Sequence, residues 1–315
     1  MQTDVRNKVR AGIAGAGVFG NFHAQKYADL EGASLTAIFD CDSDRAAVLA
    51  RKFGVPAYDD FSKFLDAIDI VSIATPAQTH FSLAREALSA GKHCLVEKPI
   101  ALDPADAEEL NRLAQLRGCV LQVGHQERFV AEAEGLFDDA DQIDRIIFNR
   151  CCPATGRGED ASVVFDLTIH DLDLARQFDF GEPVRVEARG DEHQVTASLW
   201  FAGGRRFDFV SSRRASEANR SMVIETKKGP LRYDFLSRKK EGRFSLVSTN
   251  RKPSEKKLTD PLGYGVRRFV DAVRNGTAAA ITGDDGLRAL EWAQQIEDVR
   301  LTTPHYYEYG KEAVA

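Results

Sequence analysis

The sequence contains an aspartate and a histidine one helical turn apart, and the types and spacing of these side chains suit proton transfer. Asp166 and His170 lie in a stretch, about 163–178, whose apolar spacing predicts an amphipathic helix, and Asp173 continues their stripe. Histidine titrates near neutrality, so His170 can act as a general base while Asp166 orients its ring. The alternative is that the stripe is only a solvated helix face, which is the commoner role of such a pattern.

A lysine offers a second group for the same chemistry. Glu97-Lys98-Pro99 closes a predicted strand, and an ammonium group there can donate a hydrogen bond to a hydroxyl oxygen as negative charge develops on it. Oxidation of a secondary alcohol needs such help, because the hydroxyl proton must leave when the carbon gives up a hydride. We therefore expect Lys98 and His170 to converge on one oxygen from two domains, across a cleft.

A glycine-rich loop gives that reaction a site for a hydride acceptor. Gly15-Ala-Gly17-Val18-Phe19-Gly20 directly follows the first predicted strand and opens the first predicted helix. In this order the first glycine permits a tight turn, the second lets a pyrophosphate approach the backbone, and the third lets the helix pack on the strand. The helix N-terminus adds free N–H groups. A glycine-rich surface turn is the alternative, but the strand, loop and helix in sequence favour a dinucleotide site.

An aspartate at the end of the second predicted strand indicates which dinucleotide is bound. Asp40 lies 20 residues after Gly20, where a carboxylate can accept hydrogen bonds from the adenosine ribose and repel a 2′-phosphate. This favours NAD over NADP, unless Asp40 only begins a turn. Thr75-Pro76 closes the fourth predicted strand, and ligands of parallel sheets bind at this carboxyl edge.

The elements that must hold these groups fall into two series. Residues 8–124 alternate apolar runs with amphipathic helical stretches, which predicts an α/β Rossmann fold with a doubly wound parallel sheet. We place its strands at Val9–Ala14, Ser34–Asp40, Val55–Tyr58, Ile68–Ala74, His93–Glu97 and Cys119–Gly124. Because 315 residues exceed one typical core, we divide the chain into a dinucleotide-binding domain, 1–124, and an α+β substrate and oligomerisation domain, 125–315.

Strands separated by tight turns dominate the second series and predict an antiparallel meander. They are placed at Arg145–Arg150, Val184–Gly190, Gln194–Phe201, Arg206–Ser211, Met222–Thr226 and Leu231–Leu236. The helix at 163–178 interrupts them, and helices over about Tyr264–Arg274 and Asp284–Arg300 close the chain.

Charge and composition exclude several partners. A formal net charge of −6 gives no overall attraction to phosphate backbones or anionic membranes, so we expect no nucleic-acid and no membrane partner. Neither a signal peptide nor a membrane-spanning run is evident, which predicts a cytoplasmic protein. Five cysteines, two of them adjacent, fit reduced thiols better than a disulfide framework. We expect no metal site, because Asp171 points about 100° from His170 on a helix.

Several motifs together resemble one known family, that of glucose–fructose oxidoreductase, inositol dehydrogenase and MocA. They are GAGVFGNFH at 15–23, ATPAQTH at 74–80, EKP at 97–99, DxxxH at 166–170, FVDAVRNG at 269–276 and TGDDGLRALE at 282–291. The resemblance covers nearly the whole chain. It implies a second domain with an open-faced antiparallel sheet, whose outer face often joins copies of the chain into a homodimer or homotetramer.

The resemblance also implies roles for individual residues. Lys98 would be the catalytic lysine, His170 the general base and Asp166 its partner. The cofactor would be lined by Gly15, Gly17, Val18, Phe19, Gly20, Asp40, Thr75, Pro76, His80 and Glu97, with Glu97 near the nicotinamide ribose.

Two stretches are similar to the branch of that family containing UDP-N-acetylglucosamine 3-dehydrogenases. They are VGHQERF at 123–129 and DASVVFDLTIHDLDL at 160–174. Val130-Ala131 follows the first, where the branch usually has Asn-Pro, so the sugar is left open. We name His125, Arg128 and Arg157 as substrate-binding candidates, since guanidinium groups can pair with a diphosphate. His125 could equally be a core histidine.

These observations predict NAD-dependent oxidation of a ring hydroxyl on a sugar or nucleotide-sugar. One alternative is a glycosidase of the same family, which would use transient oxidation to cleave a glycosidic bond. A second is a non-enzymatic dinucleotide sensor. Such a sensor can dispense with proton-handling groups, so Lys98, Asp166 and His170 speak against it.

Overall fold

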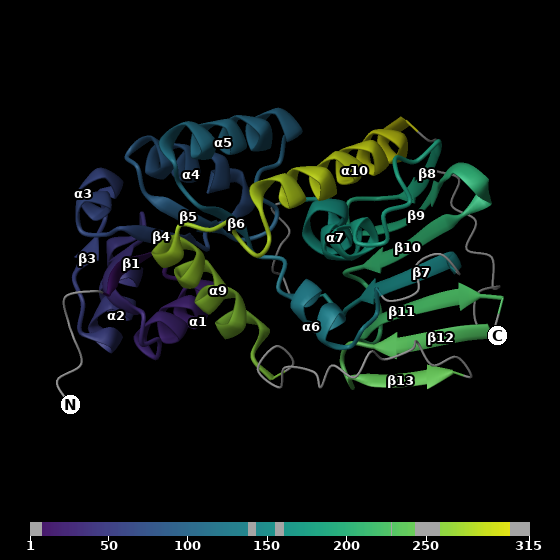
Figure 1. The fold of residues 1–315 in the computed structure, drawn as a ribbon, viewed down its shortest axis with the longest axis horizontal. Helices are drawn as coiled ribbons and strands as arrows, with labels where there is room; N and C mark the ends of the chain where they lie inside the picture. Colours follow the sequence, from purple (N-terminus) through teal and green to yellow (C-terminus); the bar gives the residue numbers. More distant parts are fainter. Residues whose placement is uncertain (1–7, 138–142, 155–160, 228, 243–258, 303–315) are drawn as a thin grey trace. The chain divides into compact units, whose positions relative to one another are not determined.

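The chain divides into two compact units. The computed structural model describes residues 8–137, 143–154, 161–227, 229–242 and 259–302 (Figure 1). The first unit comprises Met1–Asp141, Ile169–Asp179 and Ser245–Trp292, and the second comprises Gln142–Thr168, Phe180–Phe244 and Ala293–Ala315. Each unit has its own sheet.

A six-stranded sheet with parallel pairing forms the first unit. Its strands are β1 (Val9–Ala14), β2 (Ala33–Phe39), β3 (Ala57–Tyr58), β4 (Ile70–Ile73), β5 (His93–Val96) and β6 (Leu121–Val123). Their order, β3-β2-β1-β4-β5-β6, confirms the predicted Rossmann fold. The order reverses between β1 and β4, and ligands of doubly wound sheets bind beside the carboxyl ends of the strands at that point.

Helices connect these strands, and three of them (α2, α3 and α5) begin at an aspartate whose side chain caps the first turn. They are α1 (Val18–Ala28), α2 (Ser43–Phe53), α3 (Phe61–Asp66), α4 (His80–Ser89) and α5 (Pro104–Arg117), followed by α6 (Glu127–Ala133). The Asp103 carboxylate accepts the backbone N–H of Ala105 at 2.8 Å, and Pro104 takes the first helical position of α5.

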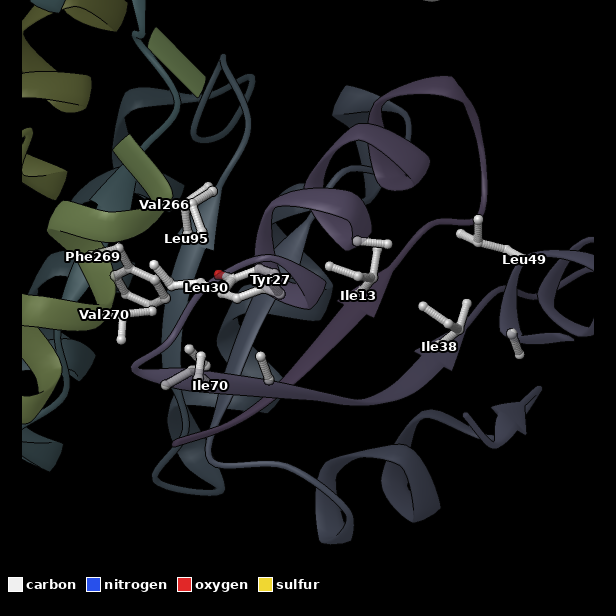
Figure 2. Close-up of a cluster of buried hydrophobic side chains, with 14 residues drawn as sticks. Ile13, Tyr27, Leu30, Ile38, Leu49, Ile70, Leu95, Val266, Phe269 and Val270 are labelled. Carbon is white, nitrogen blue, oxygen red and sulfur yellow. The ribbon is translucent and has the colours of Figure 1, made fainter. Parts of the chain in front are cut away.

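Helix α9 (Pro261–Asn275) packs into the core of this first unit although it lies far along the chain. Val266, Phe269 and Val270 of α9 are fully buried and lie in one cluster with Tyr27 of α1 and with Leu30, which follows that helix (Figure 2). The predicted domain boundary at residue 124 follows the end of β6, but the compact unit continues with α6, α7 and α9. The apolar face of a helix does not indicate which sheet the helix will cover, so the sequence could not assign these helices to a unit. The functional division at residue 124 stays a prediction.

A seven-stranded sheet forms the second unit, in the order β13-β12-β11-β7-β10-β9-β8. The strands are β7 (Ile143–Cys151), β8 (Arg185–Gly190), β9 (Gln194–Trp200), β10 (Arg206–Ser212), β11 (Asn219–Thr226), β12 (Gly229–Asp234) and β13 (Lys239–Gly242). The expectation of a simple meander is wrong at one place, because β7 inserts between β10 and β11 and pairs with β10 in parallel. The sequence pattern also missed β13, whose four residues are all exposed.

The two faces of this second sheet differ in side-chain chemistry. One face is fully buried and aromatic, with Phe148, Phe207 and Phe209 at its centre. The opposite face is half-buried and mixes charge with apolar groups. On it, Asp208 accepts hydrogen bonds from Arg145 and Arg206.

The predicted helix at 163–178 is in the expected place but not uniformly α-helical. Val164–Thr168 forms a π-helical turn, which leads directly into α7 (Ile169–Arg176). The Thr168 hydroxyl lies 2.9 Å from the Ser211 hydroxyl at the end of β10, a contact that the sequence period could not show. The closing helix α10 (Gly283–Thr302) extends beyond its predicted end.

Candidate active site

The glycine-rich loop between β1 and α1 has little room for side chains at two of its three glycines. Gly15 has a φ of +102°, and a Cβ there would lie 2.6 Å from the Ala74 carbonyl oxygen. A Cβ on Gly20 would lie 1.7 Å from the Gly15 carbonyl oxygen. At Gly17 a Cβ would meet no heavy atom within 4 Å, so the backbone there borders open space. This is the arrangement that lets a pyrophosphate approach the helix N-terminus.

Two apolar side chains follow the loop and remain exposed. Val18 is 46% exposed and Phe19 55% exposed at the first turn of α1. Phe19 meets Phe22 edge to face, with 6.1 Å between the ring centroids. These two side chains give the open space at Gly17 an apolar border, and their contact with the cofactor stays a prediction.

Asp40 is buried beside the same loop and firmly oriented. Its Oδ2 accepts the backbone N–H of Ala16 at 2.8 Å, and its Oδ1 accepts that of Asp42 at 2.9 Å. The Arg45 guanidinium donates to Oδ1 at 3.1 Å from a half-exposed position. The carboxylate is thus fixed at the carboxyl end of β2, where the sequence predicts the adenosine ribose.

His80 is buried and bridges the loop at Thr75 and the loop at Pro99. Its ring nitrogens lie 2.9 Å from the Thr75 carbonyl oxygen and 2.7 Å from the Pro99 carbonyl oxygen. Burial lowers the pKa of His80, and the carbonyls oppose that shift. With only 1% exposure, His80 holds the Thr75-Pro76 turn in place, whereas Thr75 and Pro76 keep accessible surface.

Glu97 and Lys98 follow β5, one pointing inward and one partly exposed. The Glu97 Oε1 atom lies 2.9 Å from Nε2 of His23 and accepts the Gln126 amide at 2.7 Å. Burial raises the pKa of Glu97, but His23, Gln126 and Lys98 outweigh it and hold that pKa below its ordinary value. Glu97 therefore stays a carboxylate beside the lysine. Sequence reasoning quoted His23 within a motif without giving it a role.

Lys98 and His170 belong to the same compact unit, not to two. His125 lies beside His170 and is influenced by the charge of Lys98. Its ring meets that of His170 edge to face, with 6.4 Å between centroids, and the Lys98 charge is among the groups that lower the pKa of His125 after burial itself. Both catalytic candidates therefore lie in one compact unit, because α7 belongs to the first unit, and the functional division at residue 124 that separates them stays a prediction.

His125 itself is only 2% exposed, and neither ring nitrogen has a hydrogen-bond partner among the described residues. Leaving buried nitrogens without partners costs about 1–3 kcal/mol. A hydrogen bond from a bound polar group to His125 would offset that cost. Its predicted contact with substrate stays a prediction.

Arg128 has a structural role that the sequence did not indicate. It is 4% exposed, and its guanidinium pairs in bidentate fashion with Asp173 of α7 while Nη1 lies 3.1 Å from Asp285 Oδ1 at the start of α10. Two carboxylates therefore already occupy the guanidinium, which speaks against the predicted diphosphate contact. Arg157, the other arginine candidate, lies outside the described residues.

Asp166 lies in the π-helical turn and faces a buried arginine. Nη1 of Arg213 is 4.0 Å from Asp166 Oδ2, and Nη2 of Arg213 donates to the carbonyl oxygens of Ala161 and Glu192 at 2.6 and 2.9 Å. The neighbouring Arg214 is exposed and pairs with Asp191. Arg213 therefore fixes the turn that carries Asp166. Single-turn π-helical insertions are frequent at functional sites.

Among the described residues, no three His, Cys, Asp or Glu side chains gather as metal ligands. In those same stretches, no helix combines the length and apolar character needed to cross a bilayer. All five cysteines carry free thiols.

A surface cavity of about 1000 Å³ lies elsewhere in the first unit. His93 and Leu121, which begin β5 and β6, line it together with residues of α5 and the segment before α10. It thus opens at the amino ends of these strands, and no candidate cofactor or catalytic residue lines it.

The chain is similar to known proteins in sequence and in fold. Residues 9–125 match the model of an oxidoreductase family with an NAD-binding Rossmann fold, GFO/IDH/MocA. The UDP-N-acetylglucosamine 3-dehydrogenase of Acidithiobacillus ferrooxidans is 36% identical over 236 residues, which cover 73% of this chain and 75% of the relative. The chain belongs to the GFO/IDH/MocA oxidoreductase family.

Other members of this family match at lower identity. The NAD-dependent scyllo-inositol 2-dehydrogenase of Bacillus subtilis is 26% identical, with 91% of this chain and 92% of that protein covered. Among solved structures, the A. ferrooxidans 3-dehydrogenase superposes with a TM-score of 0.80 at 32% identity and covers 93% of this chain and 98% of its own. This GFO/IDH/MocA protein is an NAD-dependent dehydrogenase that acts on CH–OH groups.

The residues at the cofactor edge fit NAD. Open space at Gly17, the N-terminus of α1 and the fixed carboxylate of Asp40 suit a pyrophosphate and an adenosine ribose. Glu97 and Lys98 lie at the next-but-one strand end, toward which the second half of a dinucleotide extends. When bound, NAD supplies a carbon that accepts a hydride.

Proposed function

We propose that this GFO/IDH/MocA enzyme oxidises a ring hydroxyl of a sugar or nucleotide-sugar, with the C3 hydroxyl of UDP-N-acetylglucosamine as the first candidate. Similarity to the A. ferrooxidans 3-dehydrogenase supports the nucleotide-sugar. The observation that carries the proposal is the position of His125, which lies beside His170 and within reach of the Lys98 charge. An ammonium group and an imidazole near one buried point suit an alcohol that must lose a proton.

The proposed reaction divides the work among three side chains. His170 accepts the hydroxyl proton, while Lys98 donates a hydrogen bond to the oxygen as it gains negative charge. The carbon that bears this oxygen loses a hydride and becomes a ketone, so the substrate loses one proton and one hydride in all. Asp166 precedes His170 by four residues on the same helical segment and stabilises its protonated form. Positioned proton transfer of this kind contributes roughly 10²–10⁴-fold.

A direct assay tests this proposal. The protein is incubated with NAD and UDP-N-acetylglucosamine, NADH absorbance is followed, and the product is analysed for a 3-keto sugar. Inositols and other sugar nucleotides form a comparison panel. We expect NADH in proportion to ketone for the true substrate.

Two results would count against the proposal. Release of a free sugar without NADH would indicate the glycosidase chemistry instead. NAD binding without turnover on any member of the panel would indicate a sensor.

We further propose that copies of the chain associate as a homodimer or homotetramer through the outer face of the second sheet. Ile147 of β7 pairs in register with Val223 of β11, and both are half-buried on the face opposite Phe148. Asp208 and its arginines surround them with paired charge. An apolar centre with a polar rim is the usual anatomy of an interface.

Light scattering after size-exclusion chromatography tests the association. Val223→Glu should give monomers, whereas Leu116→Glu on α5, where the leucine is already 68% exposed, should keep the oligomer. A monomeric wild-type protein at micromolar concentration would refute this part. We also propose a cytoplasmic location, supported by the free thiols.

A further inference from the structure

A buried histidine on α1 has no place in the mechanism described so far. His23 is fully buried, and Nε2 of its ring lies 2.9 Å from Glu97 Oε1. Since α1 begins at the glycine-rich loop and Glu97 follows β5, this contact joins the pyrophosphate end of the cofactor edge to the end beside Lys98. Both partners lie within the first unit.

The Glu97 carboxylate is held in one orientation. Because an ionised carboxylate can only accept hydrogen bonds, the ring nitrogen of His23 that faces it must carry a proton. The Gln126 amide donates to the same oxygen at 2.7 Å. Gly124 lies against the carboxylate, and a Cβ at that position would come within 2.8 Å of Oε1 and 2.9 Å of Oε2. Two donors and a glycine floor thus leave the side chain little freedom.

Both donors bind Oε1, so the two carboxylate oxygens of Glu97 differ in their hydrogen bonding. No hydrogen bond to Oε2 is found among the described residues, and the Glu97 side chain keeps 9% exposure. A carboxylate oxygen with free lone pairs, beside a lysine at a strand's carboxyl end, is a good acceptor for a pair of ligand hydroxyls.

We infer that His23 is a positioning residue, which with Gln126 turns Glu97 so that Oε2 receives the hydroxyls of the second ribose of the dinucleotide. The inference concerns the cofactor and does not depend on which sugar is oxidised. A failure to oxidise UDP-N-acetylglucosamine would therefore leave it standing. The adenosine half of the cofactor should be indifferent to His23.

Two ligands separate the halves of the dinucleotide. ADP contains the adenosine ribose and the pyrophosphate, whereas ADP-ribose also contains the second ribose. Isothermal titration of His23→Leu should show about a tenfold weaker affinity for ADP-ribose, equivalent to about 1.4 kcal/mol, and an unchanged affinity for ADP. His23→Gln, whose amide reaches the same distance as Nε2, should restore most of the affinity for ADP-ribose.

Controls exclude a merely structural role. Gln25 lies on the same helix and its amide donates to Asp29 at the surface, so Gln25→Ala should bind both ligands as the wild type does. If His23→Leu fails to fold, Gln126→Leu removes the other donor to Oε1 and should show the same selective loss. Equal losses for ADP and ADP-ribose, or wild-type affinity for both in a folded variant, would overturn the inference.

Discussion

The glycine-rich loop and the helical segment 164–176 hold their functional groups by different means. In the loop, hydrogen bonds to backbone N–H groups do this, as when Asp40 accepts the N–H groups of Ala16 and Asp42. In the helical segment, buried arginines far away in the sequence pair with carboxylates, with Arg128 bound to Asp173 and Arg213 facing Asp166. The loop is thus held through its backbone and the helical segment through ion pairs between side chains.

This difference teaches where substitutions should act on binding and where on catalysis. The loop has little space for extra atoms, so substitutions that add atoms should have the largest effects on stability and cofactor binding there. The helical segment depends on ion pairs, so substitutions that remove a charge should have the largest effects on stability and catalysis there. The following predictions test that contrast.

The largest effect is expected when the proton-handling groups are removed. Lys98→Met and His170→Asn should each lower kcat/KM by roughly 10²–10⁴-fold, because the substrate oxygen loses its donor or its base. NADH affinity, measured by fluorescence, should stay near the wild-type value. Activity within tenfold of the wild type in either variant would remove that residue from the proposed chemistry.

A matched pair of glycine substitutions separates folding from binding in the loop. Gly20→Ala places a methyl group 1.7 Å from the Gly15 carbonyl oxygen and should destabilise the protein by about 3 kcal/mol in urea unfolding. Gly17→Ala meets no protein atom within 4 Å, so its stability should change by less than about 0.5 kcal/mol. Its methyl group enters the space expected for the pyrophosphate, so NAD affinity should still fall. Normal NAD binding by Gly17→Ala would move the pyrophosphate elsewhere.

Two adjacent arginines test the helical segment. Arg213 is 6% exposed and donates to two carbonyls, so Arg213→Met should cost about 2 kcal/mol of stability and lower kcat more than KM. Arg214→Met removes an exposed pair with Asp191 and should change stability by less than about 1 kcal/mol. Equal effects of the two variants would mean that the turn carrying Asp166 does not need the buried charge.

Cofactor choice should depend on the pair formed by Asp40 and Arg45. Asp40→Ser removes the carboxylate that repels a 2′-phosphate and frees the Arg45 guanidinium, now 3.1 Å from Asp40, to meet that phosphate. The ratio of kcat/KM for NADP to that for NAD should rise by about tenfold, or about 1.4 kcal/mol. Adding Arg45→Ala should reverse most of this gain, and an unchanged ratio in the single variant would contradict the role given to Asp40.

The smallest effect concerns acid stability. Burial raises the pKa of Asp285, but Arg128 and Thr282 outweigh it and hold that pKa below its ordinary value. The unfolded chain thus binds the proton more readily, so this carboxylate stabilises the fold above about pH 4 and the contribution is lost as pH falls through the lowered pKa. Asp285→Asn should flatten the acid limb of the unfolding free energy against pH, and an identical limb would refute the link.

The sequence was most informative where spacing is dictated locally. Each of the six parallel strands, the loop glycines and the cap at Asp103 could be placed, because turns and caps need particular residues at particular positions. The helix that carries His170 was located, but its π-helical start was not, since Thr168 bonds to a serine on a distant strand.

Contacts between distant residues were beyond the sequence pattern. Arg128 was a substrate-binding candidate, yet it is buried between Asp173 and Asp285. His23 appeared in a motif without a role, yet it is buried against Glu97. The insertion of β7 beside β10 also depends on pairing, because alternation shows which face of a strand is buried but not which neighbour it has. The sequence pattern therefore does not determine which strands pair or which distant side chains meet.

The packing of α9 on α1 bears on how the protein is made. A ribosome releases β1 to β6 long before it releases Pro261–Asn275, and until then Tyr27 and Leu30 have no cover from that helix (Figure 2). A fragment that ends at Val123 should consequently be unstable and prone to aggregate. The strands that are synthesised earlier complete their core only after α9, which is synthesised later, packs on them.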